Sequence, residues 1–203
     1  MSHVPRDEAR SALRQAAWAL GYPDRRFWRL CRSLGRARSE SGETSGSEGE
    51  PLSHFLSEIS SRSEGWLEEH YVATFDFSPE HSLYLTSHEH GDDRARGTAM
   101  LALKKRIEEA GYFLDEGQLP DFLPLLLEFL SVAGLDPEDP VEPRLRAVAD
   151  RIAASLETAQ SPYVWVFRSI QEALPVVPVS LPRGRSDQEE EREPMPYPLQ
   201  YGS

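Results

Sequence analysis

The sequence contains a single cysteine, Cys31, among its 203 residues. One cysteine cannot form an internal disulfide, and it excludes a metal site built from several cysteines. No apolar run is long enough to span a bilayer, because the longest stretch, residues 119–135, is interrupted by two prolines and by the carboxylates Asp121 and Glu128. The first ten residues contain no apolar segment of the kind found in signal peptides. From these absences we expect a cytoplasmic protein.

Basic residues are outnumbered as well. There are 22 Lys and Arg residues against 34 Asp and Glu residues, which gives a formal net charge of −12 and contributes to a mean hydropathy of −0.53. This balance argues against a protein that binds nucleic acid by neutralising phosphates. Residues 51–143 hold nineteen acidic and six basic residues, whereas residues 1–35 hold seven basic and three acidic ones. Such an acidic surface attracts a cationic partner and repels an anionic membrane, or it is simply a solvated surface that aids solubility.

Two segments have too few apolar side chains to pack. Residues 36–50 are mostly Ser, Gly and Glu, and residues 175–203 combine six prolines with an acidic run. We expect a disordered linker in the first and a mostly disordered tail in the second. Residues 1–35 would then form the N-terminal helices, and residues 51–174 the main helical body, of a single domain.

The spacing of apolar residues predicts an all-α fold, a single compact helical domain of roughly seven to nine helices. The expected helices cover residues 6–20, 24–35, 51–59, 67–77, 92–110 and 120–132, a segment opened by Pro143, and 161–174. Gly35 would end the second helix, Asp92 would cap the long one, and Pro124 fits only in a first turn. Only residues 82–86 and 175–180 resemble strands, and neither has an evident pairing partner.

The common catalytic motifs are absent: there is no nucleophile elbow, P-loop or dinucleotide fingerprint. Cys31 lies in a basic stretch, but its helical position favours a buried structural role. Three histidines, His81, His88 and His90, fall within ten residues, and we interpret them as ordinary loop histidines rather than metal ligands.

The two carboxylates in the apolar stretch do not form an evident acid–base pair either. Asp121 and Glu128 would lie about 10 Å apart on one helix at ~1.5 Å per residue. That separation is long for two groups that act on one bond. Asp121 is better explained as a helix cap.

One ordered series of short motifs is more specific. It comprises YVxTFD (71–76), SLYLT (82–86), HGDxRxRG (90–97), LPDxLPxxLEF (119–129) and a final Ser-Pro-Tyr (161–163). This series resembles the nitrate reductase delta subunit family, whose members are TorD-like assembly chaperones for molybdoenzymes. The resemblance covers residues 66–174 closely. Phe122 stands where the family pattern leads us to expect a residue such as His or Tyr.

From the helical spacing and the lack of clustered ligand residues we expect the chain to be a monomer without metal or cofactor. The resemblance implies an all-helical, non-enzymatic chaperone. Such proteins bind the N-terminal segment of the apo catalytic alpha subunit of nitrate reductase in the cytoplasm. They hold it until the molybdenum cofactor and an iron–sulfur cluster are in place and membrane attachment follows. An amphipathic, basic peptide could lie as a helix in an apolar groove with an acidic rim. The helix 119–129 would form part of the groove wall.

The matched positions supply candidates for the groove and its rim, which are Asp76, Tyr84, Leu85, Asp92, Asp121 and Glu128. Asp92 and Asp121 could instead be helix caps, and Tyr84 and Leu85 could be core residues. Three further matched residues, Arg94, Arg96 and Gly97, would lock the preceding loop onto the long helix through ion pairs. Two other functions remain open: a small acidic adaptor unrelated to redox enzymes, and a hydrolase that uses Asp and His side chains.

Overall fold

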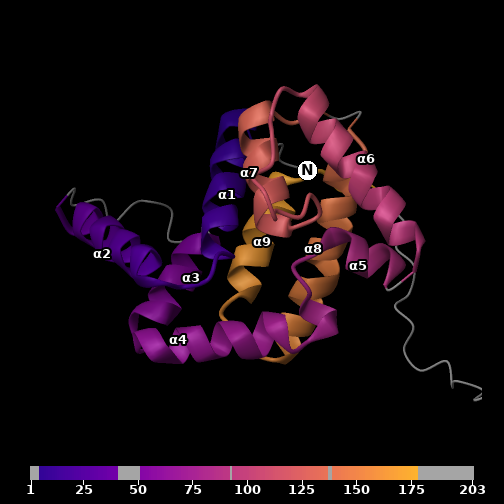
Figure 1. The fold of residues 1–203 in the computed structure, drawn as a ribbon. Coiled ribbons are helices and arrows are strands. Elements are labelled where there is room, and N and C mark those ends of the chain that lie inside the picture. The colour runs from indigo at the N-terminus through magenta and orange to yellow at the C-terminus, as the bar shows by residue number, and fades with distance from the viewer. Residues whose placement is uncertain (1–4, 41–50, 92, 137–138, 178–203) are drawn as a thin grey trace, which may run out of the picture.

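The computed structural model describes residues 5–40, 51–91, 93–136 and 139–177, and these residues are predominantly helical (Figure 1). They form nine α-helices, as predicted, together with a π-helical turn, η1 (Val72–Asp76), and a 3₁₀ turn, η2 (Pro79–His81). The α-helices are α1 (Arg6–Ala19), α2 (Arg25–Glu40), α3 (Pro51–Ser60), α4 (Glu64–Tyr71), α5 (Leu85–His90), α6 (Ala95–Glu109), α7 (Leu123–Ala133), α8 (Val141–Thr158) and α9 (Val164–Ala173). No helix among the described residues is long and apolar enough to cross a membrane.

Helix α9 lies at the centre of the molecule because it is apolar on most of its circumference. It packs against α1, α3 and α8, and α1 in turn packs against α7 (Figure 1). The apolar side of α1, which corresponds to the helix predicted for residues 6–20, faces this core, where Leu13 and Ala16 are completely buried. Helices α2 and α6 extend from opposite sides of this bundle.

The residues before α9 organise a second part of the core. Tyr163 is completely buried, and its ring lies 5.2 Å from that of Phe55 and 4.8 Å from that of Phe75, measured between centroids. Ser161 is hydrogen-bonded to His70 at 2.8 Å. The Ser-Pro-Tyr motif therefore joins α9 to the α3 and α4 region by packing, and α9 itself begins at Val164 rather than at Ser161.

The predicted end of the second helix was wrong by five residues. Helix α2 continues through Gly35 to Glu40, so the first five residues of the predicted linker are helical. A glycine inside a helix costs only about 1 kcal/mol, and the Arg and Ala residues that follow favour the helix. At the other end of the fold, Leu174 is buried whereas Val176 and Val177 are exposed. The rest of the predicted linker (41–50) and tail (178–203) lies outside the described residues.

Residues 82–86 resemble a strand in sequence but do not form one. Only Tyr84 forms a bridge, antiparallel to Phe122, and helix α5 begins at the next residue. The two backbone hydrogen bonds of this bridge run from Leu85 N to Asp121 O and from Leu123 N to Leu83 O, both at 2.8 Å. This single bridge brings the motifs at 82–86 and 119–129 into contact, although Tyr84 and Phe122 are far apart in the sequence.

Candidate functional site

A groove with a volume of about 850 Å³ runs along α1 and α7 on the side that faces α6. Its walls are mainly apolar, and they come from α1, the end of α6, the loop between α6 and α7, and α7 itself. Trp18 of α1 and Leu125 of α7 both line the groove. The only charged residues that line the groove within the described chain are Arg14 and Glu128, both exposed. A concave apolar site with a few polar groups is the usual form of a binding site.

Part of the groove consists of the bridged pair Tyr84 and Phe122. Their rings lie 5.4 Å apart, and both side chains line the groove. The backbone hydrogen bonds of the bridge fix the positions of both residues, and therefore of the two rings in the groove wall. Phe122, the position that departs from the family pattern, is thus an apolar groove residue.

Asp121 secures this arrangement from inside the protein. Its side chain is completely buried, and its Oδ2 accepts a hydrogen bond from the Thr86 hydroxyl. Arg96 donates from Nε to the same hydroxyl at 3.1 Å, and its Nη2 lies 3.6 Å from Asp121 Oδ2. A buried carboxylate requires partners of this kind. The network therefore connects the start of α7 to α5 and α6.

The loop between α6 and α7 forms the open wall of the groove. Phe113 is 83% exposed and Leu119 is 40% exposed, although both face the groove. Gly111 and Gly117 have φ angles of +84° and +87°, which side chains other than glycine rarely adopt, so the two turns of the loop depend on them. Exposed apolar side chains around a concave site mark a surface that binds another molecule.

Helices α1 and α7 are joined next to the groove by Arg10. Its Nε and Nη2 donate to the carbonyl oxygens of Ser131 and Val132 at 2.8 and 3.1 Å. A cation at the last carbonyls of a helix also interacts favourably with the helix dipole. The wall made by α1 is therefore fixed relative to the wall made by α7.

The structure separates the residues predicted to contact the peptide. Tyr84 and Glu128 line the groove, whereas Leu85 is completely buried in the core. Asp121 is buried beneath the groove, so its carboxylate is not part of the rim. The alternative that Asp121 caps α7 was wrong too, because Phe122 occupies the cap position and no side chain caps the helix.

The other predicted residues lie elsewhere. Asp76 is exposed at the end of η1 and does not line the groove, and Asp92 lies outside the described residues. Of the three predicted loop-locking residues, Arg96 makes the ion pair with Asp121, while Arg94 is exposed with no ion pair to another described residue. Gly97 is exposed, and nothing lies within 4 Å of the place where a side chain would begin.

Sequence reasoning missed the contribution of α1 to the groove. Arg14, Ala17 and Trp18 line it, yet they lie about 100 residues before α7 in the sequence. They could have been found from their positions in the expected helix 6–20, because they lie at the border between its apolar and polar faces, where side chains are only partly buried. The exposed pair Tyr112 and Phe113 was visible as an apolar run directly after Gly111.

The carboxylates of the acidic segment 51–143 are not gathered at the groove, and several of them pair with basic side chains elsewhere. Arg144 donates from two nitrogens to Glu89 at 2.6 and 2.7 Å, and Arg106 lies 2.7 Å from Asp139. Burial raises the pKa of Glu142, which accepts a hydrogen bond from Asp136 N at 2.6 Å. The prediction of a strongly acidic rim therefore reduces to Glu128 among the residues that line the groove.

The histidines and the cysteine have structural roles. His81 is hydrogen-bonded to Ser155 at 2.8 Å, and buried His88 is hydrogen-bonded to Ser82 O at 2.7 Å. No group of three potential metal ligands occurs among the residues that the structure describes. Burial raises the pKa of the Cys31 thiol to about 11, which keeps it protonated and poorly nucleophilic.

Comparison with known proteins identifies the family. The family model described as "Nitrate reductase delta subunit" matches residues 43–169. The "Probable nitrate reductase molybdenum cofactor assembly chaperone NarJ" of Bacillus subtilis (strain 168) is 36% identical over 125 residues, 62% of this chain and 68% of the relative. The "Nitrate reductase molybdenum cofactor assembly chaperone NarJ" of Escherichia coli (strain K12) is 32% identical over 151 residues, 73% of this chain and 63% of the relative.

A shorter match falls within a much larger protein. The "Nitrate reductase-like protein NarX" of Mycobacterium tuberculosis (strain ATCC 25618 / H37Rv) is 36% identical over 107 residues, which is 53% of this chain but 16% of that protein.

The described part of the chain is a helical domain with an apolar groove large enough to bind a ligand. It belongs to the nitrate reductase delta subunit family.

Proposed function

We propose that this protein is a system-specific chaperone for the assembly of a respiratory nitrate reductase. It binds the N-terminal segment of the apo catalytic alpha subunit in the groove between α1, α7 and the α6–α7 loop. It holds that subunit until the molybdenum cofactor and an iron–sulfur cluster have been inserted and the subunit attaches to its membrane anchor. The observation that carries the proposal is the apolar groove in a member of this family.

The groove suits an amphipathic peptide helix. It is lined by aromatic and aliphatic side chains, has a volume of about 850 Å³, and several of these side chains are exposed. Burying apolar area contributes about 25 cal/mol per Å² before the costs of association, so the apolar face supplies most of the affinity. A side chain such as Phe113, 83% exposed, gains the most from being covered.

Charge contributes specificity rather than most of the affinity. Glu128 is exposed and faces the groove, and no ion pair with another described residue occupies it. Asp115 and Glu116 are exposed on the loop that carries the open wall. A basic side chain of the peptide would pair with Glu128, so binding should weaken only modestly with added salt.

The first test compares two exposed phenylalanines. Phe113 lines the groove and is 83% exposed, whereas Phe77 is 80% exposed and does not line it. We expect Phe113→Ser to weaken binding of the alpha-subunit N-terminal peptide by roughly tenfold or more, since burying a phenylalanine is worth about 1.5–3 kcal/mol. Phe77→Ser should bind normally. Calorimetric titration measures both, and equal affinities would refute this groove as the peptide site.

The second test compares two exposed carboxylates. Glu128→Lys reverses a charge in the groove, and Glu69→Lys makes the same change on α4, away from it. We expect the first variant to bind the peptide several-fold more weakly and to lose most of its salt dependence, because an exposed pair contributes about 0.2–1 kcal/mol. If the two variants behave alike, the charge at the groove has no part in recognition.

We further propose that the protein acts in the cytoplasm, as a monomer, and catalyses no reaction. Its relatives carry the name of assembly chaperones, and the groove offers only Arg14 and Glu128 as charged groups among the described residues. Recovery of a molybdoenzyme catalytic subunit with the tagged protein from native cells tests the partner directly. Recovery of unrelated proteins alone would favour the adaptor interpretation.

A further inference from the structure

The N-terminal half of α2 carries an exposed row of arginines, which we call the arginine face. It consists of Arg25, Arg26 and Arg29, all exposed. At about 100° per residue these side chains fall within one sector of the helix. Phe27 and Trp28 on the other side are buried, at 3% and 7% exposure, so they attach the helix to the domain.

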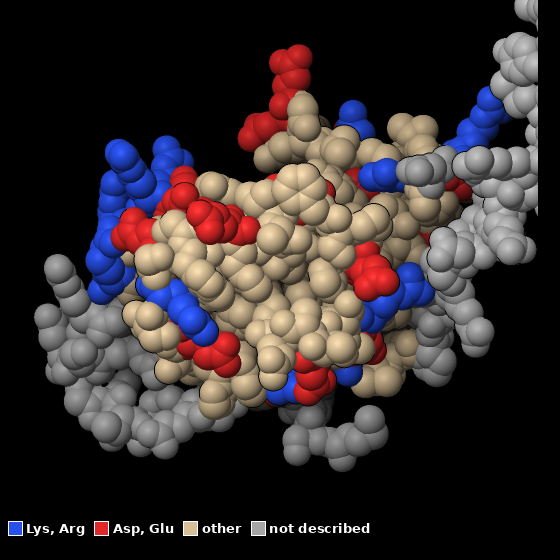
Figure 2. All heavy atoms as spheres, turned by 90° about the horizontal axis from the view of Figure 1, so that it is seen from below, with Lys and Arg blue, Asp and Glu red and all other residues tan. Residues whose placement is uncertain are grey.

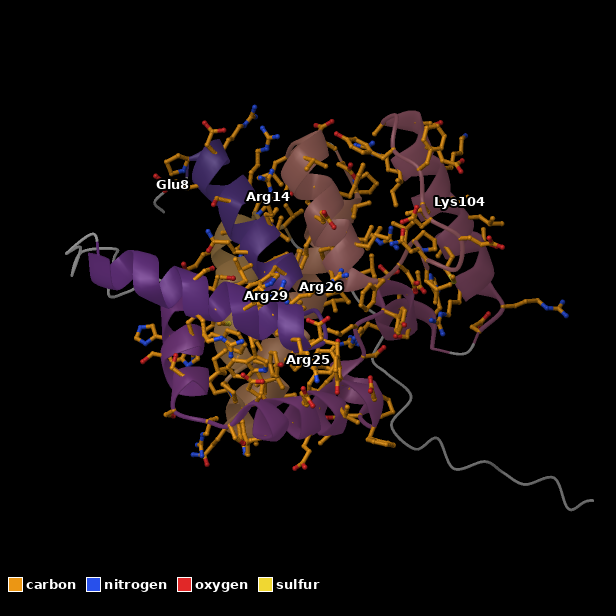
Figure 3. All side chains as sticks on the ribbon, turned by 60° about the vertical axis from the view of Figure 1, so that its left-hand side comes forward. Glu8, Arg14, Arg25, Arg26, Arg29 and Lys104 are labelled. Carbon is orange, nitrogen blue, oxygen red and sulfur yellow. The ribbon has the colours of Figure 1, made fainter. Side chains whose placement is uncertain are left out.

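The attachment leaves the arginine face turned away from the core. Phe27 stacks on Trp18 of α1 with 4.6 Å between ring centroids, which orients the first two turns of α2. Figure 3 shows Arg25, Arg26 and Arg29 together on this part of α2, with Glu8 at the far end of α1 and Lys104 on the distant α6. In Figure 1, α2 extends from the side of the bundle. A broad surface could therefore approach α2 without meeting α6.

None of the three arginines forms an ion pair with a carboxylate of the described residues, although Arg26 and Arg29 are close enough to Asp24 to lower the pKa of its carboxyl group. The nearest ion pair on the same helix joins Arg32 to Glu64 at 2.6 Å. Asp24 is close in sequence, but its Oδ1 already accepts hydrogen bonds from the backbone nitrogens of Arg26 and Phe27 at 2.7 and 3.0 Å. That carboxylate caps the helix and offsets one charge of the three. A net positive patch remains on an acidic protein.

Two exposed apolar side chains lie close to the patch in the sequence. Leu30 is 41% exposed and Tyr22 is 50% exposed. Lys and Arg residues next to exposed aliphatic and aromatic residues on a helix are typical of segments that lie at the interface of an anionic bilayer. Figure 2 shows blue side chains gathered along the edge of the molecule where α2 lies, with red ones among them.

We propose that the arginine face docks peripherally on a membrane surface that contains anionic lipids. The headgroup phosphates would meet the three guanidinium groups, and Leu30 and Tyr22 would enter the interfacial layer. A single exposed helix face can lie on a flat surface. Acidic groups elsewhere on the domain repel that surface only weakly, because salt screens charges beyond the Debye length of about 8 Å. Nucleic acid fits less well, since Leu30 and Tyr22 would stay exposed beside its phosphates. The contact involves no membrane-spanning segment and is independent of the function proposed for the groove.

The experiment is co-sedimentation of the full chain with lipid vesicles. Vesicles of phosphatidylcholine alone are compared with vesicles that also contain phosphatidylglycerol, at low and at raised salt. The variant combines Arg25→Gln, Arg26→Gln and Arg29→Gln. We expect the wild type to bind only the anionic vesicles, more weakly at raised salt. We expect the variant to bind them on the order of a hundredfold less, from the known contribution of each arginine near such a surface.

A matched control removes the same charge elsewhere. It combines Arg94→Gln, Lys104→Gln and Lys105→Gln, three exposed cations on or next to α6. The control should bind anionic vesicles like the wild type, and a variant with lysine at the three α2 positions should retain most of the binding. Circular dichroism and groove-peptide affinity should be the same for all four proteins.

Three results would overturn the proposal. The first is absence of wild-type binding to the phosphatidylglycerol vesicles. The second is an equal loss in the α2 variant and the α6 control, which would mean that only total charge matters. The third is that polyglutamate or duplex DNA, but not the vesicles, binds in a way that depends on Arg25, Arg26 and Arg29.

Discussion

The buried pair of Asp121 and Arg96 is the contact that we expect to matter most for the shape of the groove. Asp121 is completely buried, and its Oδ1 has no hydrogen-bond partner among the described residues. Its Oδ2 depends on the Thr86 hydroxyl and on Arg96, whose side chain is 29% exposed. Removing the guanidinium by Arg96→Ala would leave a buried carboxylate with one neutral donor.

The expected loss of stability depends on which partner of the pair is removed. Removing one partner of a buried ion pair costs about 3–5 kcal/mol, and the partial exposure of Arg96 places Arg96→Ala near the lower value, at about 3 kcal/mol. Asp121→Asn should cost only about 1 kcal/mol, because the amide still accepts from Thr86 and Arg96 can turn to solvent. The double variant should then cost about 1–2 kcal/mol, less than the sum of the single changes.

Urea unfolding followed by circular dichroism measures these differences. Arg94→Ala is the control, since Arg94 is an exposed arginine two residues away and should change stability by no more than about 0.5 kcal/mol. If Arg96→Ala matches Arg94→Ala, or if the effects of Arg96→Ala and Asp121→Asn simply add, the pair does not hold the bridge beneath the groove and this reasoning fails.

Two further predictions concern stability. Burial lowers the pKa of His88 below its ordinary value of 6.5, so the unfolded chain binds the proton more readily and the free energy of unfolding falls as pH drops below 6.5. His88→Gln should make this fall smaller when urea unfolding is measured across that pH range. The same pH dependence in the variant and the wild type would show that His88 is not responsible. Truncation after residue 182 should shift the thermal midpoint by no more than about 4 °C, because the deleted segment is rich in proline and glutamate; a loss of helical signal would show that residues 183–203 stabilise the domain.

Local patterns were enough to predict the fold class and most helices. The helix predicted for residues 6–20 corresponds to α1, whose Ala9, Leu13 and Ala16 are buried, and the helix predicted for residues 92–110 corresponds to α6, which ends at Glu109. These features depend on neighbours within one or two turns of chain. The end of α2 was mispredicted because Gly35 is a local signal that the rest of the helix outweighs.

The site was harder to predict because its geometry depends on distant contacts. Asp121 and Glu128 were expected on one helix face, yet α7 begins at Leu123, and the bridge to Leu83 and Leu85 turns Asp121 into the interior. A carboxylate directly before an apolar helix is normally a cap. Only the position of Thr86 and Arg96, set by α5 and α6, decides that this one is buried instead.

The net charge of the sequence also does not show which charged side chains are available to a partner, and this point concerns both proposals. The formal charge of −12 describes the distant field of the molecule, which attracts cations. At contact range, ion pairs between individual residues determine which charges remain available to a partner. Glu89 and Asp139 are paired with arginines, whereas Arg25 and Arg29 form no ion pair within the described residues. An acidic protein can thus present one carboxylate, Glu128, to a basic peptide and a separate arginine face to an anionic surface. Since the two contacts use different helices, α7 and α2, both could be made at once.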